Sequence, residues 1–265
     1  MYQEYRHALI WNGALESELE LSTDAARNLI GENNCWMLRN TFDYDCGHTT
    51  NFWFLVKDSF DEREYSKRRK KRIETANFKF KICRITSERI SGEGYRVYYE
   101  AHRAYKVNDG FVMDENDFKN EISSMNEDFE FWGCVDRETG TLEAYAVCHV
   151  HDGMCWVKYA RANPSCLAQY YPMYGLYDAC CRHYLLERKL NYVLNSARSI
   201  TQHSNIEGFL IQKFGFRKAY CRIRMHYAWW LGIAVKILYP FRNIIPVAPV
   251  KNLLKLEQIA RENNA

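Results

Sequence analysis

The 265-residue sequence has little glycine and proline, no uninterrupted long apolar run and no Cys-x-x-Cys pair. Thirteen glycines and five prolines exclude collagen-like and low-complexity chains. Aromatic residues make up 15% of the chain, which excludes disorder as its main state because they can bury much apolar surface. The most apolar stretch, residues 227–250, holds Lys236, Arg242 and three prolines. It therefore predicts no membrane-spanning helix, which needs about 20 apolar residues.

The ten cysteines fall inside apolar stretches rather than at the loop spacings of a disulfide framework. The chain starts Met-Tyr-Gln-Glu-Tyr-Arg-His, with no apolar run behind it. We therefore expect reduced thiols in the core of a cytoplasmic protein, and a peripheral contact with the inner face of the membrane stays open.

The net charge is only +3, but it is distributed unevenly. Residues 63–72 carry seven bases and one acid, residues 109–143 eleven acids and two bases, and residues 216–265 nine bases and two acids. The molecule as a whole is no generic polyanion binder, whereas its basic segments can attract phosphates or an anionic surface.

The pattern of apolar and turn residues predicts an α/β (α+β) protein with a mixed, mainly antiparallel sheet flanked by helices. Residues 1–125 form an N-terminal α/β region in this interpretation, residues 126–228 the core and residues 229–265 an apolar and basic tail. In the core, three antiparallel strands (129–135, 142–151 and 155–161) precede a loop over 162–171. A helix from Pro172, a strand over 191–196, a helix over 204–214 and a strand over 216–227 follow.

This β-β-β-α-β-α-β order resembles the GNAT superfamily of acyl-CoA N-acyltransferases. The resemblance is most specific at Ser204–Tyr220, where a helix ends in Phe-Gly-Phe-Arg and runs into a strand. The basic run Ser66–Ala76, ahead of a strand and a tyrosine-rich helix, resembles the Fem-like branch of that superfamily. The resemblance implies transfer of an acyl group from acetyl-CoA or another acyl-CoA to a primary amine on a small or lipid-linked acceptor.

The usual glycine-rich acyl-CoA loop of GNAT enzymes is missing, and Arg161–Pro172 stands in its place. Without those glycines, only a helix start, Arg161 and polar side chains remain to hold a pyrophosphate. The resemblance places Tyr159, Arg161 and Asn163 on one lip of the acyl-carrier groove and Ser196 on the other. It also places the helix start near Pro172 toward the phosphates and Asn205 toward the carrier.

Amine acylation needs a group that removes an ammonium proton and a group that stabilises the oxyanion. His203 lies just before the capping box Ser204–Glu207, close to the expected carrier site, and histidine titrates near neutrality. Glu143, His149 and His151 share a strand face and are the other candidate bases. Tyr220 or Tyr227 is the candidate donor to the leaving thiolate. Each of these side chains can equally be a packed or surface residue.

His149 and His151 with Cys148 and Cys155 nearby could bind zinc, but Cys148 points to the opposite face of its strand, so we expect no metal. The basic run Lys67–Arg72 is suited to tRNA, a phosphorylated or lipid-linked substrate, or anionic lipid. The tail from Tyr227 to Arg242 resembles an interfacial membrane segment, or a segment that wraps a domain core. Residues 251–261 predict a small surface helix.

Three functions follow from these patterns. The first is an acyl-CoA-dependent N-acyltransferase. The second is a Fem-like transferase that uses aminoacyl-tRNA. The third is a GNAT-like module without catalysis that binds an anionic lipid or a membrane surface. The oligomeric state has no signature in the sequence.

Overall fold

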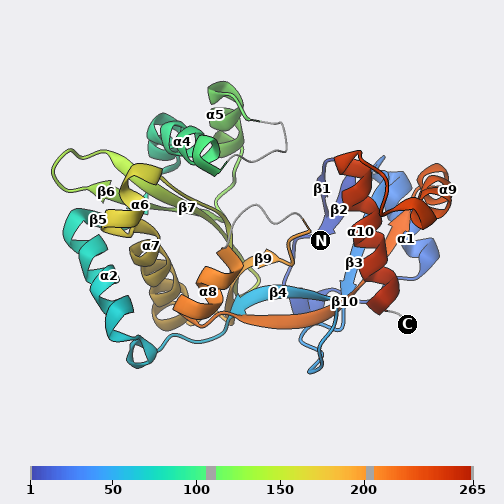
Figure 1. Cartoon of the computed structure of the whole chain (residues 1–265), viewed down its shortest axis with the longest axis horizontal. Helices are drawn as coiled ribbons and strands as arrows, with labels where there is room; N and C mark the ends of the chain where they lie inside the picture. The colour runs from blue at the N-terminus through green and yellow to red at the C-terminus, as the bar shows by residue number, and fades with distance from the viewer. Residues whose placement is uncertain (1, 106–111, 201–205, 264–265) are drawn as a thin grey trace. The chain divides into compact units, whose positions relative to one another are not determined.

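The computed structural model describes residues 2–105, 112–200 and 206–263, which fall into two compact units. The first unit comprises residues 1–55, 197–202 and 218–265, and the second comprises 56–196 and 203–217. Each unit therefore gathers segments that are far apart in the sequence (Figure 1).

The first unit is built on the strand order β1-β2-β3-β10-β4. These strands span Tyr2–Tyr5, Ala8–Trp11, Met37–Phe42, Arg217–Tyr227 and Phe52–Lys57, and the last of them continues into the second unit. β2 and β3 are parallel, and β10 is antiparallel to β3. The unit also contains η1 (Leu15–Ser17), α1 (Thr23–Glu32), α9 (Trp229–Leu238), η5 (Tyr239–Phe241) and α10 (Ala248–Asn263).

The helix expected over 251–261 is present, but it is neither small nor confined to the surface. The helix α10 is longer, and Leu254, Leu256 and Ile259 on it are buried. Leu256 and Ile259 share one side of the helix, whereas Leu254 lies on another side, so α10 is buried on more than one side.

The second unit has the strand order β9-β8-β7-β6-β5. These strands span Tyr192–Ala197, Met154–Ala162, Leu142–His151, Phe129–Asp136 and Phe80–Ile85. The pairings from β5 to β8 are antiparallel, and β8 with β9 is parallel. Turns with positive φ at Asp152 and Gly153 close the hairpin between β7 and β8, as the sequence predicts.

Helices cover both faces of this sheet. They span η2 (Glu62–Glu64), α2 (Lys67–Lys79), α3 (Ser87–Arg89), η3 (Ile90–Gly94), α4 (Tyr95–Tyr105), α5 (Glu115–Ser123), α6 (Pro164–Tyr170), α7 (Pro172–Cys181), η4 (Arg182–Glu187) and α8 (Ile206–Phe214). The expected order β-β-β-α-β-α-β and the mixed, mainly antiparallel sheet are confirmed.

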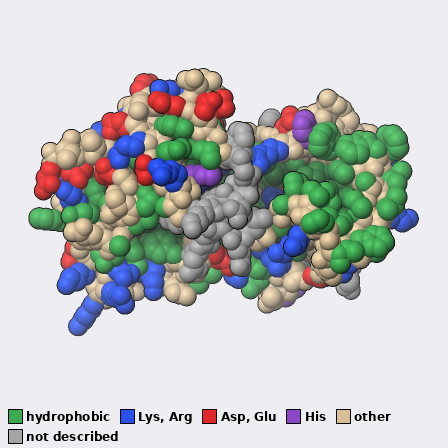
Figure 2. Space-filling view, turned by 45° about the horizontal axis from the view of Figure 1, so that its top comes forward, with side chains coloured by type: hydrophobic (Ala, Val, Ile, Leu, Met, Phe, Trp, Pro, Cys, Tyr) green, Lys and Arg blue, Asp and Glu red, His purple; other side chains and the backbone are tan. Residues whose placement is uncertain are grey.

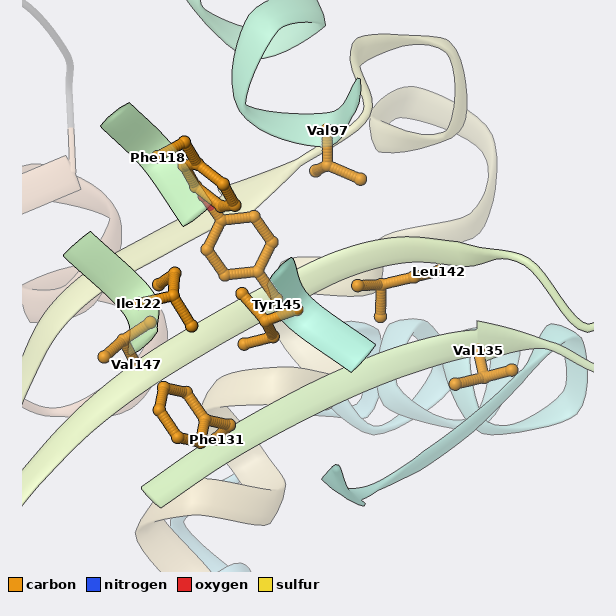
Figure 3. Packing of buried hydrophobic residues seen from close by; sticks show 9 residues of the cluster. Val97, Phe118, Ile122, Phe131, Val135, Leu142, Tyr145 and Val147 are labelled. Atoms are coloured by element: carbon orange, nitrogen blue, oxygen red, sulfur yellow. The ribbon is translucent and has the colours of Figure 1, made fainter. Parts of the chain in front are cut away.

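The core under α4 and α5 joins Val97, Phe118 and Ile122 from these helices to Tyr145 and Val147 from β7 (Figure 3). Strict alternation along β7 would place Leu142 on the face opposite Tyr145, together with Ala144. The register between β6 and β7 shifts at Glu143, so Leu142 turns to the Tyr145 side and joins the same core.

The expected loop over 162–171 contains the helix α6, which begins at Pro164. Asn163 caps this helix by accepting from the Ser165 backbone N–H at 3.1 Å, and Tyr171 with φ of 52° separates α6 from α7. The helix α7 begins at Pro172 as the sequence predicts. All ten cysteines are free thiols, and eight of them are buried.

Candidate active site

The strands β8 and β9 are paired only at their beginning. Their register joins Met154 to Tyr192, Cys155 to Val193 and Trp156 to Leu194. Six further residues of β8 and three of β9 follow these pairs without a parallel partner in that register. We call the part of these strands that lies in the second unit, residues 157–162 with 195–196, the β8–β9 opening. An extended ligand can pair with a strand edge of this kind through its own amide groups.

Two side-chain contacts hold the near end of the opening. The Trp156 Nε1 donates to the backbone oxygen of Asn195 at 3.3 Å. The Asn195 amide in turn donates to the Tyr177 hydroxyl on α7 at 2.8 Å. The start of the opening is therefore fixed by a strand, a helix and an indole ring.

A β-bulge places Lys158 at the start of the opening. Tyr159 pairs with Val147 and Val157 pairs with Cys148, so Lys158 is the extra residue of β8. Its Nζ lies 3.7 Å from the centre of the Trp156 ring. Burial lowers the pKa of Lys158 to about 8, because a partly desolvated ammonium is less stable than one in water. The amine therefore exchanges its proton close to physiological pH.

His149 of β7 is buried. It pairs with Trp156 of β8, so the two side chains lie on the same side of the sheet. Its ring stacks on Phe129 with centroids 4.4 Å apart and lies 4.0 Å from the ring of His151. Burial lowers the pKa of His149 to about 4, with further contributions from His151 and Lys158. The imidazole is therefore neutral at pH 7 and too weak a base to hold a proton there.

Tyr159 and Arg161 follow Lys158 along β8. The Tyr159 hydroxyl donates to Glu121 Oε1 on α5 at 2.6 Å. Arg161 is exposed, and its Nη1 donates to the backbone oxygen of Ala160 at 3.1 Å. Because both pair with β7 residues that face α5, they lie on the same side of the sheet as His149.

Glu143 and Asn163 form a separate polar cluster. Glu143 Oε2 accepts from the Asn163 amide at 2.8 Å, and Oε1 accepts from Arg96 at 2.9 Å. Asn163 also caps α6 through Ser165. Glu143 and His149 are six residues apart on one strand, so they are separated by roughly 20 Å. The structure thus brings Glu143 together with Asn163 but not with His149.

The remaining expected site residues lie elsewhere. Ser196 stands near the end of β9 in the β8–β9 opening and is half-buried. Tyr220 belongs to the first unit, where its ring lies edge-on to Trp53. His203 and Asn205 lie outside the described residues, as does the start of the expected capping box.

The start of α7 does not lie beside the β8–β9 opening, contrary to the expectation for Pro172. The Pro172 backbone oxygen is 3.6 Å from Cys134 Sγ on β6, and β6 is two strands away from β8. The insertion of α6 after β8 accounts for this displacement. Arg72 on α2 instead lies near the start of α7, with its guanidinium 4.8 Å and 5.0 Å from the ring centres of Tyr171 and Tyr174.

Two bases of the basic run, Arg69 and Arg72, pack against other side chains of the second unit. Arg69 is buried, with its guanidinium 3.3 Å from the centre of the Tyr65 ring and hydrogen-bonded to the backbone of Lys213. Arg72 contacts the two tyrosines of α7. Four bases are exposed: Lys67, Arg68, Lys70 and Lys71.

Within the described ranges, no group of three or more His, Cys, Asp and Glu side chains is placed to hold a metal ion. In the same ranges, no helix combines the length and the apolar character needed to cross a bilayer.

Sequence reasoning missed Lys158, Trp156 and Asn195. The sequence pattern places Lys158 on a strand. The bulge that sets the position of its side chain depends on the register between β7 and β8. No local residue pattern signals that register, so the lowered pKa of Lys158 could not be predicted.

No protein-family model matches the chain, and no curated protein does. Among solved structures, the chain is similar to FemX, with 8% identity and a TM-score of 0.52 over 75% of each chain. It is also similar to the C-terminal DUF2156 domain of a putative lysylphosphatidylglycerol synthetase from Agrobacterium fabrum. That likeness has 12% identity and a TM-score of 0.53, over 89% of this chain and 82% of that one. At these identities the likenesses show a shared fold.

Proposed function

We propose that the second unit transfers an acyl group from an activated carrier to a primary amine. The observation that carries this proposal is the β8–β9 opening with Lys158 at its start. The opening offers a strand edge to an extended carrier arm, and Lys158 offers an amine that exchanges its proton near pH 8. The fold shared with FemX and with the synthetase domain supports the same class of reaction.

In the proposed reaction, the acceptor enters as an ammonium ion and must lose a proton before it can attack. The neutral form of Lys158 takes that proton. The amine nitrogen then bonds to the carrier carbonyl, and the bond from that carbonyl to the carrier sulfur or oxygen breaks. The second proton that the amine nitrogen loses passes to this sulfur or oxygen, so the carrier leaves as a thiol or hydroxyl. Holding the two reactants in line supplies most of the rate, and the proton transfer contributes about 10²–10⁴-fold.

Acyl-CoA is the first carrier in this proposal. Its acyl arm would lie in the β8–β9 opening, with Tyr159, Arg161 and Ser196 around it. Because α7 starts over β6 and Asn163 caps α6, the phosphates would be held by side chains such as Arg161 rather than by a free helix start.

A second carrier, aminoacyl-tRNA, is favoured by a specific observation. Four bases of α2 are exposed, and a row of like charges on one helix is stabilised by a polyanion. Binding of tRNA through these side chains would weaken steeply as salt is raised, because bound phosphates release counterions.

The test combines binding with turnover. Thermal shift is measured with acetyl-CoA, palmitoyl-CoA, CoA and bulk aminoacylated tRNA, and product is then sought by mass spectrometry with a panel of primary amines. A carrier at a hundred times its dissociation constant should stabilise the protein by about 2.7 kcal/mol. Absence of a shift with every CoA species and with tRNA would contradict the proposal.

A matched pair of variants isolates the role of Lys158. Lys158→Met should retain carrier binding and lose at least a hundredfold in transfer rate at pH 7, since it removes the proton acceptor. Lys218→Met is the control, because Lys218 Nζ also lies over an indole ring, 3.9 Å from Trp53, in the first unit. Equal losses in both variants would show that Lys158 has no chemical role.

A further inference from the structure

The first unit exposes a set of large apolar side chains on α9 and the turn that follows it. We call this set the apolar face: Trp229, Trp230, Ile233, Ile237, Phe241 and Ile244. Trp229 is 78% exposed and Ile244 is 76% exposed. Figure 2 shows hydrophobic side chains gathered over the part of this unit where Figure 1 places α9. A contiguous apolar surface of this kind on a soluble domain marks an interaction site.

The helix α9 presents its apolar side outward. Trp229, Ile233 and Ile237 are four residues apart, so they form one stripe along the helix, and Trp230 flanks it. Val235 is the buried residue of α9 and points to the other side. Trp230 also lies edge-on to Trp36, which is itself 48% exposed, with ring centres 5.7 Å apart. The stripe is therefore extended by an indole from another segment of the chain.

The segment that carries the apolar face has a positive net charge. The sequence has no Asp or Glu between Tyr227 and Leu256, and it has four bases there. Lys236 is exposed within α9, and Arg242 lies in the turn between Phe241 and Ile244. Long basic side chains at the margin of an apolar stripe can keep their charge in water while the stripe is buried.

We propose that the apolar face docks the protein onto an anionic lipid bilayer. Tryptophan is enriched at the boundary between lipid headgroups and acyl chains, and an interfacial helix pairs such residues with lysine and arginine. Charge complementarity favours lipid over a second copy of this chain. A symmetric dimer through this face would bring the bases of both copies together, whereas anionic headgroups neutralise them.

The experiment is sedimentation of the full chain with vesicles. One set contains phosphatidylcholine alone, and the other contains phosphatidylcholine mixed with phosphatidylglycerol. The protein should bind the mixed vesicles more tightly, and binding should fall as salt is raised. The double variant Ile233→Asp/Ile237→Asp should lose about tenfold or more in partitioning, because it places two carboxylates in the apolar stripe. Lys236→Glu should reduce the preference for anionic vesicles and leave the weak binding to neutral ones.

Phe78→Asp is the matched control, because Phe78 is 86% exposed on α2 in the second unit. It should bind vesicles as the wild type does. Three results would each overturn the proposal: no binding to either vesicle, equal binding by wild type and by the Ile233→Asp/Ile237→Asp variant, or a dimer that this variant abolishes in the absence of lipid. Circular dichroism of the variants separates loss of docking from loss of folding. None of these outcomes depends on transfer activity.

Discussion

The substitution Gly133→Ala tests the packing that holds α4 and α5 over the candidate active site. Gly133 lies in β6 opposite Tyr145 of β7. A Cβ atom there would lie 2.8 Å from Ile85 Cδ1 and 2.8 Å from Leu142 Cδ1, and 3.1 Å from Ile85 Cγ2. The added methyl is close to side chains on two sides. Leu142 is fully buried and cannot move without disturbing the core, whereas Ile85 is only partly buried and can move in part.

Overpacking of this size costs about 1–3 kcal/mol in the free energy of unfolding. Urea unfolding, followed by tryptophan fluorescence, measures the loss as a lower midpoint at unchanged slope. Gly92→Ala is the control in the same unit, because nothing lies within 4 Å of its added methyl. That variant should gain about 0.5–1 kcal/mol, since it removes a glycine from a helical turn.

A second substitution makes the reasoning refutable. Ile85→Val removes Cδ1 and should restore part of the stability lost in Gly133→Ala, with a coupling of about 1 kcal/mol in the double-mutant cycle. If Gly133→Ala is as stable as Gly92→Ala, or if the two substitutions Gly133→Ala and Ile85→Val are additive, the described packing of Leu142 and Ile85 is wrong.

Two further predictions concern buried polar groups. The pKa of His149 is lowered to about 4 in the folded protein, so the unfolded chain binds the extra proton between about pH 6.5 and pH 4. The free energy of unfolding should therefore fall by up to about 3 kcal/mol as pH drops through that window. His149→Phe, which keeps the stacking on Phe129, should make the free energy of unfolding less dependent on pH. If this dependence is the same in the variant and the wild type, the lowered pKa of His149 is refuted. Glu18→Leu should lower the free energy of unfolding of the first unit by about 3 kcal/mol, because it removes the acceptor of three hydrogen bonds. Glu18 Oε1 accepts from Tyr2 Oη at 2.9 Å, from Asn40 Nδ2 at 3.1 Å and from the Thr41 N–H at 2.8 Å. A loss under 1 kcal/mol in chemical denaturation would contradict this prediction.

The order of elements along the core and most of their positions could be predicted from the sequence, because turn residues and periodicity signal them locally. Asp152 and Gly153 mark the hairpin, Pro172 marks the start of α7, and Gly215 ends α8 with φ of 67°. The helix α6 was missed because its seven residues, Pro164–Tyr170, are too few to show a periodic pattern, although Asn163 caps it. Its short apolar content is equally typical of a loop.

The candidate site was predicted less well than the fold, because it depends on pairings between strands. The alternation of polar and apolar residues in β7 can be seen in the sequence. The sequence does not show that Glu143 is hydrogen-bonded to Asn163 and Arg96. It also does not show that His149 is too buried to act as a base at pH 7. The roles of His203, Asn205, Ser196 and Tyr220 stay predictions.

The most direct test of the acyl-transfer account is hydrogen exchange of the full chain, read by mass spectrometry, with and without saturating palmitoyl-CoA or aminoacylated tRNA. If a carrier arm occupies the β8–β9 opening, the amides of residues 157–162 and 195–196 should exchange more slowly in the presence of one of these carriers than in buffer alone. Arg161→Ala should weaken that protection for acyl-CoA. If both carriers leave exchange in these two segments unchanged while protecting other parts of the chain, the opening is not the carrier site and the proposed reaction is contradicted.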